Sequence, residues 1–183
     1  MMKNILLLSI IFAISCSPNH SNLKDNQEII EMYNADQADR VKNDNWVIIN
    51  KNDKLRRMRI EELLDSNKII TSVDYKNAAM IFQHGEDSNS YKMAIKMMQK
   101  SIDLDSTIDK WLYAAATDRY LMSIGKSQIY GTQYIQEEKS ITMGKYDTTI
   151  INDSERIKYG VKILEEQKVW LTKMNLMIQK DNN

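Results

Sequence analysis

The chain has 183 residues, and 25 Asp and Glu side chains match its 25 Lys and Arg side chains, so its formal net charge is zero. This length is enough for one domain with its own core, and the matched charge gives no broadly basic surface, so we expect no nucleic-acid partner. Cys16 is the only cysteine, which excludes a disulfide framework and a cysteine-based zinc site.

The first fifteen residues have the layout of a secretory signal peptide. Lys3 precedes a short apolar run, Ile5 to Ile14, which is too short to span a bilayer as a helix. Ser15 then precedes Cys16 as in the bacterial lipobox, where the thiol is acylated after cleavage before the cysteine. We expect a signal peptide over 1–15 and a lipid-anchored Cys16 on the extracytoplasmic side of the cell envelope. Outer-membrane transfer is compatible with Ser17, which is not acidic.

Residues 16–26 are polar, contain the only proline, and predict a flexible tether to a domain over 27–183. In this domain, apolar residues recur at the three- and four-residue spacings typical of helices. The predicted helices span about 27–41, 53–64, 72–84, 91–104, 108–124 and 154–178.

Two details of these elements are specific enough to test. Trp46–Ile49 predicts a short extended or buried segment. The helix over 53–64 is expected to have an apolar inner side and a charged outer side, formed by Leu55, Met58, Ile60, Leu63 and Leu64 and by Arg56, Arg57 and Glu61, respectively. Gly85 is expected to end the helix before it in a left-handed conformation.

Residues 128–136 predict an extended segment, and Ser140–Thr142 is expected to pair with Thr148–Ile151 as a hairpin around Gly144. The predicted fold class is therefore mainly α: one compact multi-helix domain with a short β-hairpin near residues 138–151.

Asp118 and Arg119 are polar residues in the most apolar predicted helix. Adjacent positions on a helix point about 100° apart, so each charge needs its own partner, and burying either without one would cost several kcal/mol. One interpretation is a structural network in which Arg119 pairs with Asp36 or Asp39. The other is a ligand site.

His84 is the only histidine besides His20, which lies in the tether. Its place in a last helical turn has a structural explanation, since the helix dipole favours imidazolium there. A catalytic role needs a carboxylate that orients the ring, and Asp118 is the candidate. One imidazole without paired ligand spacing predicts no metal site, and no cofactor is expected.

The segment Gln128-Ile129-Tyr130-Gly131-Thr132-Gln133 gathers amide, phenol and hydroxyl groups around one glycine. It is either a turn whose side chains cap helix ends or a recognition loop in which Tyr130 and Gln133 bind polar atoms of a ligand near Gly131.

Several blocks of the sequence resemble an uncharacterised bacterial family, domain of unknown function 6624, over residues 28 to 170. The blocks are Asp-Gln-Ala-Asp-Arg at 36–40, Gln83-His84-Gly85, Asp118-Arg119 and Tyr130-Gly131-Thr132-Gln133. The resemblance implies a mainly helical domain, sometimes secreted, with no established activity. It also implies one shared site formed by Gln83, His84, Asp118, Arg119, Gln128, Thr132 and Gln133.

Our main hypothesis is a lipid-anchored domain that binds a polar or anionic ligand. The ligand-binding residues would be Gln83, Arg119, Gln128, Tyr130, Thr132 and Gln133. One alternative is an extracytoplasmic hydrolase or lyase that uses His84 and Asp118. Another is a structural lipoprotein, or one that binds an envelope protein, with a buried polar network.

Overall fold

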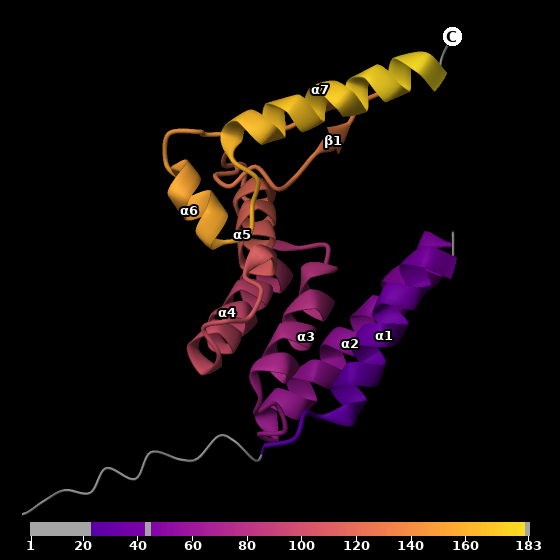
Figure 1. The fold of residues 1–183 in the computed structure, drawn as a ribbon. Helices are drawn as coiled ribbons and strands as arrows, with labels where there is room; N and C mark the ends of the chain where they lie inside the picture. Colours follow the sequence, from indigo (N-terminus) through magenta and orange to yellow (C-terminus); the bar gives the residue numbers. More distant parts are fainter. Residues whose placement is uncertain (1–22, 43–44, 182–183) are drawn as a thin grey trace, which may run out of the picture.

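The computed structural model describes residues 23–42 and 45–181 (Figure 1). The predicted signal peptide and Cys16 lie outside the described residues. Within them, the fold consists of seven helices and one two-stranded antiparallel sheet. The elements are α1 (Gln27–Lys42), α2 (Trp46–Asp65), α3 (Ser72–Gln83), α4 (Ser88–Leu104), α5 (Trp111–Ser123), β1 (Ile135–Gln136), β2 (Ile141–Thr142), α6 (Asp153–Lys158) and α7 (Leu164–Asp181).

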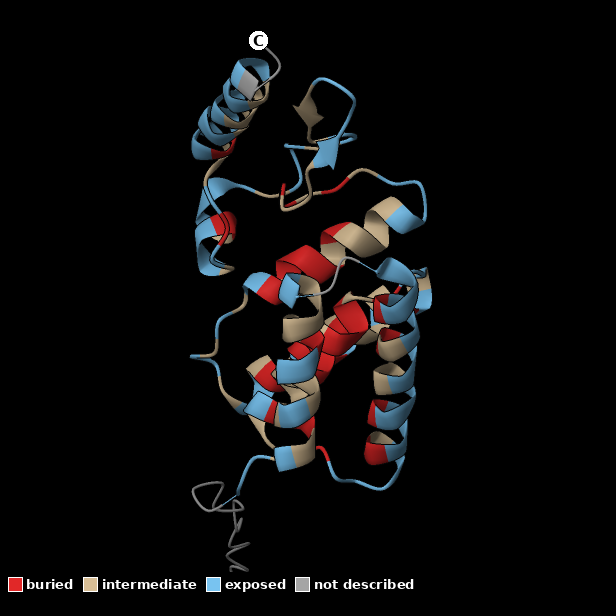
Figure 2. Cartoon of the chain, turned by 90° about the vertical axis from the view of Figure 1, so that its right-hand side faces the viewer, coloured by how far each residue is buried: buried red, intermediate tan, exposed pale blue. Residues whose placement is uncertain are grey.

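The prediction of a mainly α-helical domain is confirmed. Helix α3 lies in the middle and contacts α1, α2, α4 and α5, whereas α7 lies across one end of the domain and contacts β2 (Figure 1). Figure 2 shows the buried residues gathered where the central helices meet. Fully buried Ala78 and Ala79 of α3 share this core with Ala94 of α4 and Ala116 of α5, and such small side chains let helices approach closely.

Local hydrogen bonds determine where α3 and α4 begin. Thr71 and Asp74 form a capping box at the start of α3, and the Asp87 side chain accepts a hydrogen bond from the Ser90 backbone N–H at the start of α4. These caps satisfy backbone donors that a helix leaves free. Thr71, rather than Ser72, is therefore the capping residue of α3.

Helix α2 differs from the prediction in its start and in its buried face. The helix begins at Trp46, because Asn45 caps it, and the Trp46 side chain in this first turn is exposed. Leu55 and Met58 are about half exposed, at 55% and 50%, whereas Arg56 turns inward. The segment is thus helical, not extended, although Ile49 is buried. Ile60 and Leu63 are buried as expected, but the prediction was wrong for Leu55 and Met58, because the buried stripe of α2 runs through Asp53, which pairs with Arg40 of α1.

Gly85 ends α3 for a reason other than backbone handedness. Its φ is not positive, but a Cβ on Gly85 would lie 2.1 Å from the Cβ of Ser90. Only glycine fits at this position, because the first turn of α4 packs directly against it.

The hairpin and the last helix also differ in detail. Strand β2 pairs with β1, with Ile135 opposite Thr142, and not with residues 148–151. The expected single C-terminal helix is two helices, because Gly160 adopts a φ of 66° and ends α6, while Tyr159 stacks on Tyr113. None of the described helices has the length and apolar character needed to cross a membrane.

Candidate functional site

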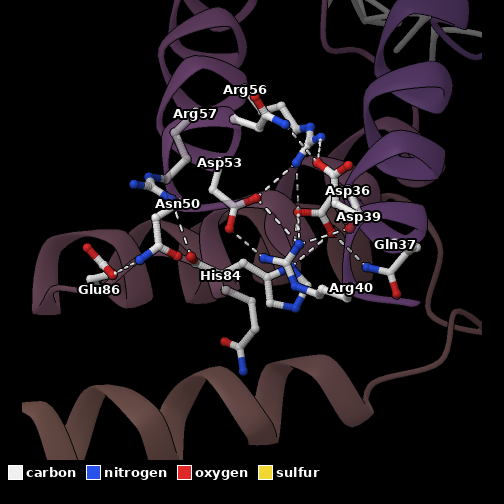
Figure 3. Close-up of polar contacts among 12 residues, drawn as sticks. Asp36, Gln37, Asp39, Arg40, Asn50, Asp53, Arg56, Arg57, His84 and Glu86 are labelled. Atoms are coloured by element: carbon white, nitrogen blue, oxygen red, sulfur yellow. Dashed lines mark hydrogen bonds and ion pairs between the residues drawn. The ribbon is translucent and has the colours of Figure 1, made fainter. Parts of the chain in front are cut away.

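A cluster of charged side chains joins α1 and α2 to the C-terminal end of α3 (Figure 3). Buried Asp36 lies at its centre, where His84 Nδ1 is 2.9 Å from Asp36 Oδ2 and Arg40 Nη1 is 3.1 Å from Asp36 Oδ1. Arg40 also binds Asp53 Oδ2, at 2.6 Å. Arg56 completes the cluster by pairing with Asp39 and Asp53.

The cluster keeps Asp36 ionised. Burial alone would raise the pKa of Asp36, but the hydrogen bond and charge of His84, the charge of Arg40 and a hydrogen bond from Gln37 outweigh burial and hold this pKa below its usual range. An ionised Asp36 favours a proton on His84 Nδ1, which leaves Nε2 as the acceptor of a neutral ring. Asp36, and not Asp118, is therefore the carboxylate that orients His84.

Arg119 reaches from α5 to the C-terminal end of α3, next to His84. Its Nε donates to Gln133 Oε1 at 3.0 Å, and its Nη1 donates to the backbone oxygen of Gln83 at 3.0 Å. No carboxylate pairs with Arg119 within residues 23–42 and 45–181. The expected pairing of Arg119 with Asp36 or Asp39 was thus wrong, because Arg40, Arg56 and His84 take these carboxylates.

The guanidinium of Arg119 lines an open cleft of about 420 Å³. Burial lowers the pKa of Arg119, the nearby phenol of Tyr91 opposes this shift, and the charge of Arg40 adds to it. An arginine nevertheless stays protonated in proteins. The cleft therefore has a positive charge that forms no ion pair with any carboxylate of the described residues. Its lining residues are Glu86, Tyr91, Arg119, Met122, Ser123 and Gln133.

Asp118 points away from this cleft into the loop that follows α5. It is fully buried, and its Oδ1 accepts the backbone N–H groups of Ile129 and Tyr130 at 2.8 and 3.0 Å. Its Oδ2 accepts the backbone N–H and the hydroxyl of Thr132 at 2.9 and 2.7 Å. The four hydrogen bonds that this carboxylate accepts from described residues thus shape the loop.

Gln128 and Tyr130 also build the loop. The buried Gln128 amide donates to the backbone oxygens of Gln133 and Met143 and accepts the Gln133 backbone N–H. The Tyr130 ring is buried against Tyr159. The only predicted ligand-binding group that the loop presents to the cleft is therefore Gln133.

Gly131 also has a structural role, because two side chains pack closely against its backbone. It has a φ of 81°, and a Cβ there would lie 2.3 Å from Gln167 Oε1 and 2.7 Å from the Tyr146 hydroxyl oxygen. The close approach at Gly131 is thus made by protein side chains, which favours the structural interpretation of this turn over the recognition loop.

The structure brings together four of the eight predicted site residues in the domain. Arg119 joins Gln133 to Gln83, and Gln83 precedes His84. Gln83 is buried, and its Oε1 accepts no hydrogen bond among the described residues. The other four, Asp118, Gln128, Tyr130 and Thr132, form the supporting loop.

Sequence reasoning missed Asp53 and Arg56 as members of the charged cluster. The signal was present, because Ile49, Asp53, Ile60 and Leu63 follow a helical spacing and all four are buried. Reading the acidic residue as part of that stripe would have placed Arg56 next to it, one turn on.

The described residues contain no group of three or more His, Cys, Asp or Glu side chains arranged to hold a metal ion. Comparisons with protein-family models, with characterised proteins and with solved structures found no match for the chain. The resemblance to domain of unknown function 6624 therefore stays a prediction, and the geometry of the Arg119 cleft carries the functional argument.

Proposed function

We propose that this protein is a bacterial envelope lipoprotein whose helical domain binds a small polar or anionic ligand in the Arg119 cleft. The observation that carries the proposal is a partly buried guanidinium that lines a cleft and has no carboxylate partner in the described structure. Placing a charge in such a position costs free energy unless a counter-charge meets it. A bound anion would supply that counter-charge.

The geometry of Arg119 suits this role. A guanidinium has five N–H groups, and the hydrogen bonds of Arg119 to Gln133 and Gln83 hold its plane in place. The remaining donors are free to bind a carboxylate or phosphate through two parallel bonds. The loop that Asp118 organises thus contributes indirectly, by fixing Gln133 against Arg119.

Titration of the full chain with inorganic phosphate and with acetate tests the proposal. We expect both anions to shift the Arg119 Nε–H resonance in NMR spectra, and Arg119→Gln to weaken binding about tenfold or more, as for loss of a charged hydrogen bond. Arg59→Gln is the matched control, because Arg59 of α2 is exposed, pairs with Glu28 of α1 and Glu62 of α2, and does not line the cleft.

Arg119→Lys separates charge from geometry, since it keeps the positive charge but lacks the planar guanidinium that donates to Gln133 and Gln83 from two different nitrogens. Circular dichroism establishes that each variant is folded. Equal anion binding by the wild-type chain and folded Arg119→Gln would refute the proposal.

The hydrogen bond between His84 and Asp36 favours a second candidate function, proton transfer in a hydrolase or lyase. The buried Asp36 carboxylate on Nδ1 orients the ring and leaves Nε2 as the proton acceptor, and the His84 side chain is 16% exposed. Hydrolysis of p-nitrophenyl acetate is a direct test. A catalytic dyad predicts a rate that falls in both His84→Gln and Asp36→Asn, whereas unchanged rates would exclude this chemistry for esters.

A further inference from the structure

We infer that the Arg119 cleft binds a zwitterion of amino-acid or short-peptide size, with its carboxylate on Arg119 and its ammonium group on Glu86. This inference rests on the proposed function and names the chemical class of its ligand. It comes from the second charged side chain in the cleft, Glu86, which an anion bound to Arg119 would not pair with.

Glu86 lines the same cleft as Arg119. It is exposed, and its Oε1 accepts a hydrogen bond from Asn50 Nδ2 at 2.6 Å (Figure 3). Glu86 also borders a neighbouring cleft with Lys54 and Arg57, yet no cation pairs with it within the described residues. The Arg119 cleft thus presents one free charge of each sign.

Both charged groups are held in place. Asn50 of α2 anchors the Glu86 carboxylate, and Glu86 follows Gly85, which α4 packs against, and precedes Asp87, which caps α4. Arg119 is held by Gln133 and Gln83. Because neither side chain pairs with the other, the two charges stay available for opposite ends of one ligand.

The two signs together also select against simpler ions. A ligand with only negative charge would meet Glu86, and one with only positive charge would meet Arg119, so each pays an electrostatic penalty that a zwitterion avoids. The cleft volume of about 420 Å³ lies within the range of small-molecule sites. Met122 and Tyr91 supply apolar surface for a short side chain.

Three dipeptide probes and calorimetric titration of the full chain test the inference. Alanyl-alanine has both charges, N-acetyl-alanyl-alanine lacks the ammonium, and alanyl-alaninamide lacks the carboxylate. We expect alanyl-alanine to bind about tenfold or more tightly than either blocked form. Glu86→Gln keeps the shape of the side chain and should make the free and N-acetylated dipeptides bind equally. Glu138→Gln, exposed in the turn between β1 and β2, is the control and should change nothing.

The outcomes separate this inference from the proposed function. Equal affinity of the wild-type chain for free and N-acetylated dipeptide overturns the inference, while acetate and phosphate binding through Arg119 would still support an anion site. Equal affinity for the free and amidated dipeptide overturns it as well. Failure of every carboxylate and phosphate probe to bind overturns both.

Discussion

Asp118→Asn tests whether this carboxylate organises the loop between α5 and β1. Asp118 is 0% exposed and accepts four hydrogen bonds, three from backbone N–H groups and one from a hydroxyl. Asparagine has nearly the same shape but only one acceptor oxygen. If that oxygen serves Ile129 and Tyr130, the new NH₂ group faces the backbone N–H of Thr132, which is left without an acceptor.

The expected loss of stability follows from these bonds. Hydrogen bonds to a charged group contribute about 1.5–3 kcal/mol each, and an unsatisfied buried donor costs about 1–3 kcal/mol. Losing the charge and both bonds to Thr132 should therefore cost about 4 kcal/mol in all. This is a large fraction of the roughly 5–15 kcal/mol that stabilises a typical domain.

Urea unfolding of the full chain measures this loss. With a slope of about 2 kcal/mol per molar urea, the unfolding midpoint should fall by about 2 M. Hydrogen exchange should quicken most at the amides of residues 129–132. Asp65→Asn is the matched control, because Asp65 is exposed at the end of α2 and its replacement should be nearly neutral.

A cost below about 1 kcal/mol for Asp118→Asn, with unchanged exchange at residues 129–132, would refute the structural role. Asp118 would then again be a candidate for direct participation in the site.

Three further predictions concern other parts of the chain. Because the folded pKa of Asp36 lies below its usual value, its carboxylate contributes stability that is present above about pH 4 and is lost as the pH falls through the folded pKa. Asp36→Asn should thus lower the free energy of unfolding by about 3 kcal/mol at neutral pH. In the variant this free energy should also fall less steeply as the pH is lowered below about 4. Urea unfolding at several acidic pH values, with the same pH dependence in both proteins, would contradict this. Gly131→Ala should destabilise the protein about 2 kcal/mol more than Gly125→Ala, because both have positive φ but only at Gly131 does a Cβ meet other atoms; thermal unfolding with equal losses would contradict the packing role. Cys16→Ser should remove the acyl mass in mass spectrometry and release the protein from the membrane fraction, whereas a free thiol on an uncleaved wild-type chain would contradict the lipobox prediction.

Local signals predicted most of the fold. Apolar spacing located most of the helices, and α5 ends at Ser123, within one residue of its predicted end, where Gly125 follows with a φ of 76°. The errors occurred where contacts between elements distant in sequence overrode the local preference. Leu55 has the character of a core residue, but the buried face of α2 combines apolar Ile60 and Leu63 with Asp53, which pairs with Arg40 of α1. Leu55 lies outside this face and is about half exposed.

The site shows the same division. The sequence singled out His84, Arg119 and Gln133 as polar groups that do not suit a simple helical core, and the structure places them around one side of α3. It could not assign their partners. His84 and its carboxylate Asp36 are 48 residues apart, and the pairing arises only when α1 packs against α3.

By itself the sequence determined the mainly helical class, most helix positions and a small group of residues able to bind ligands or transfer protons. It could do so because caps, glycines and apolar periodicity act over a few residues. Only the tertiary structure decided that Asp118 turns into the loop while Arg119 faces the cleft with Glu86. Adjacent side chains on a helix diverge by about 100°, so neighbours in sequence enter different surroundings, and the packing of distant elements selects what each one meets.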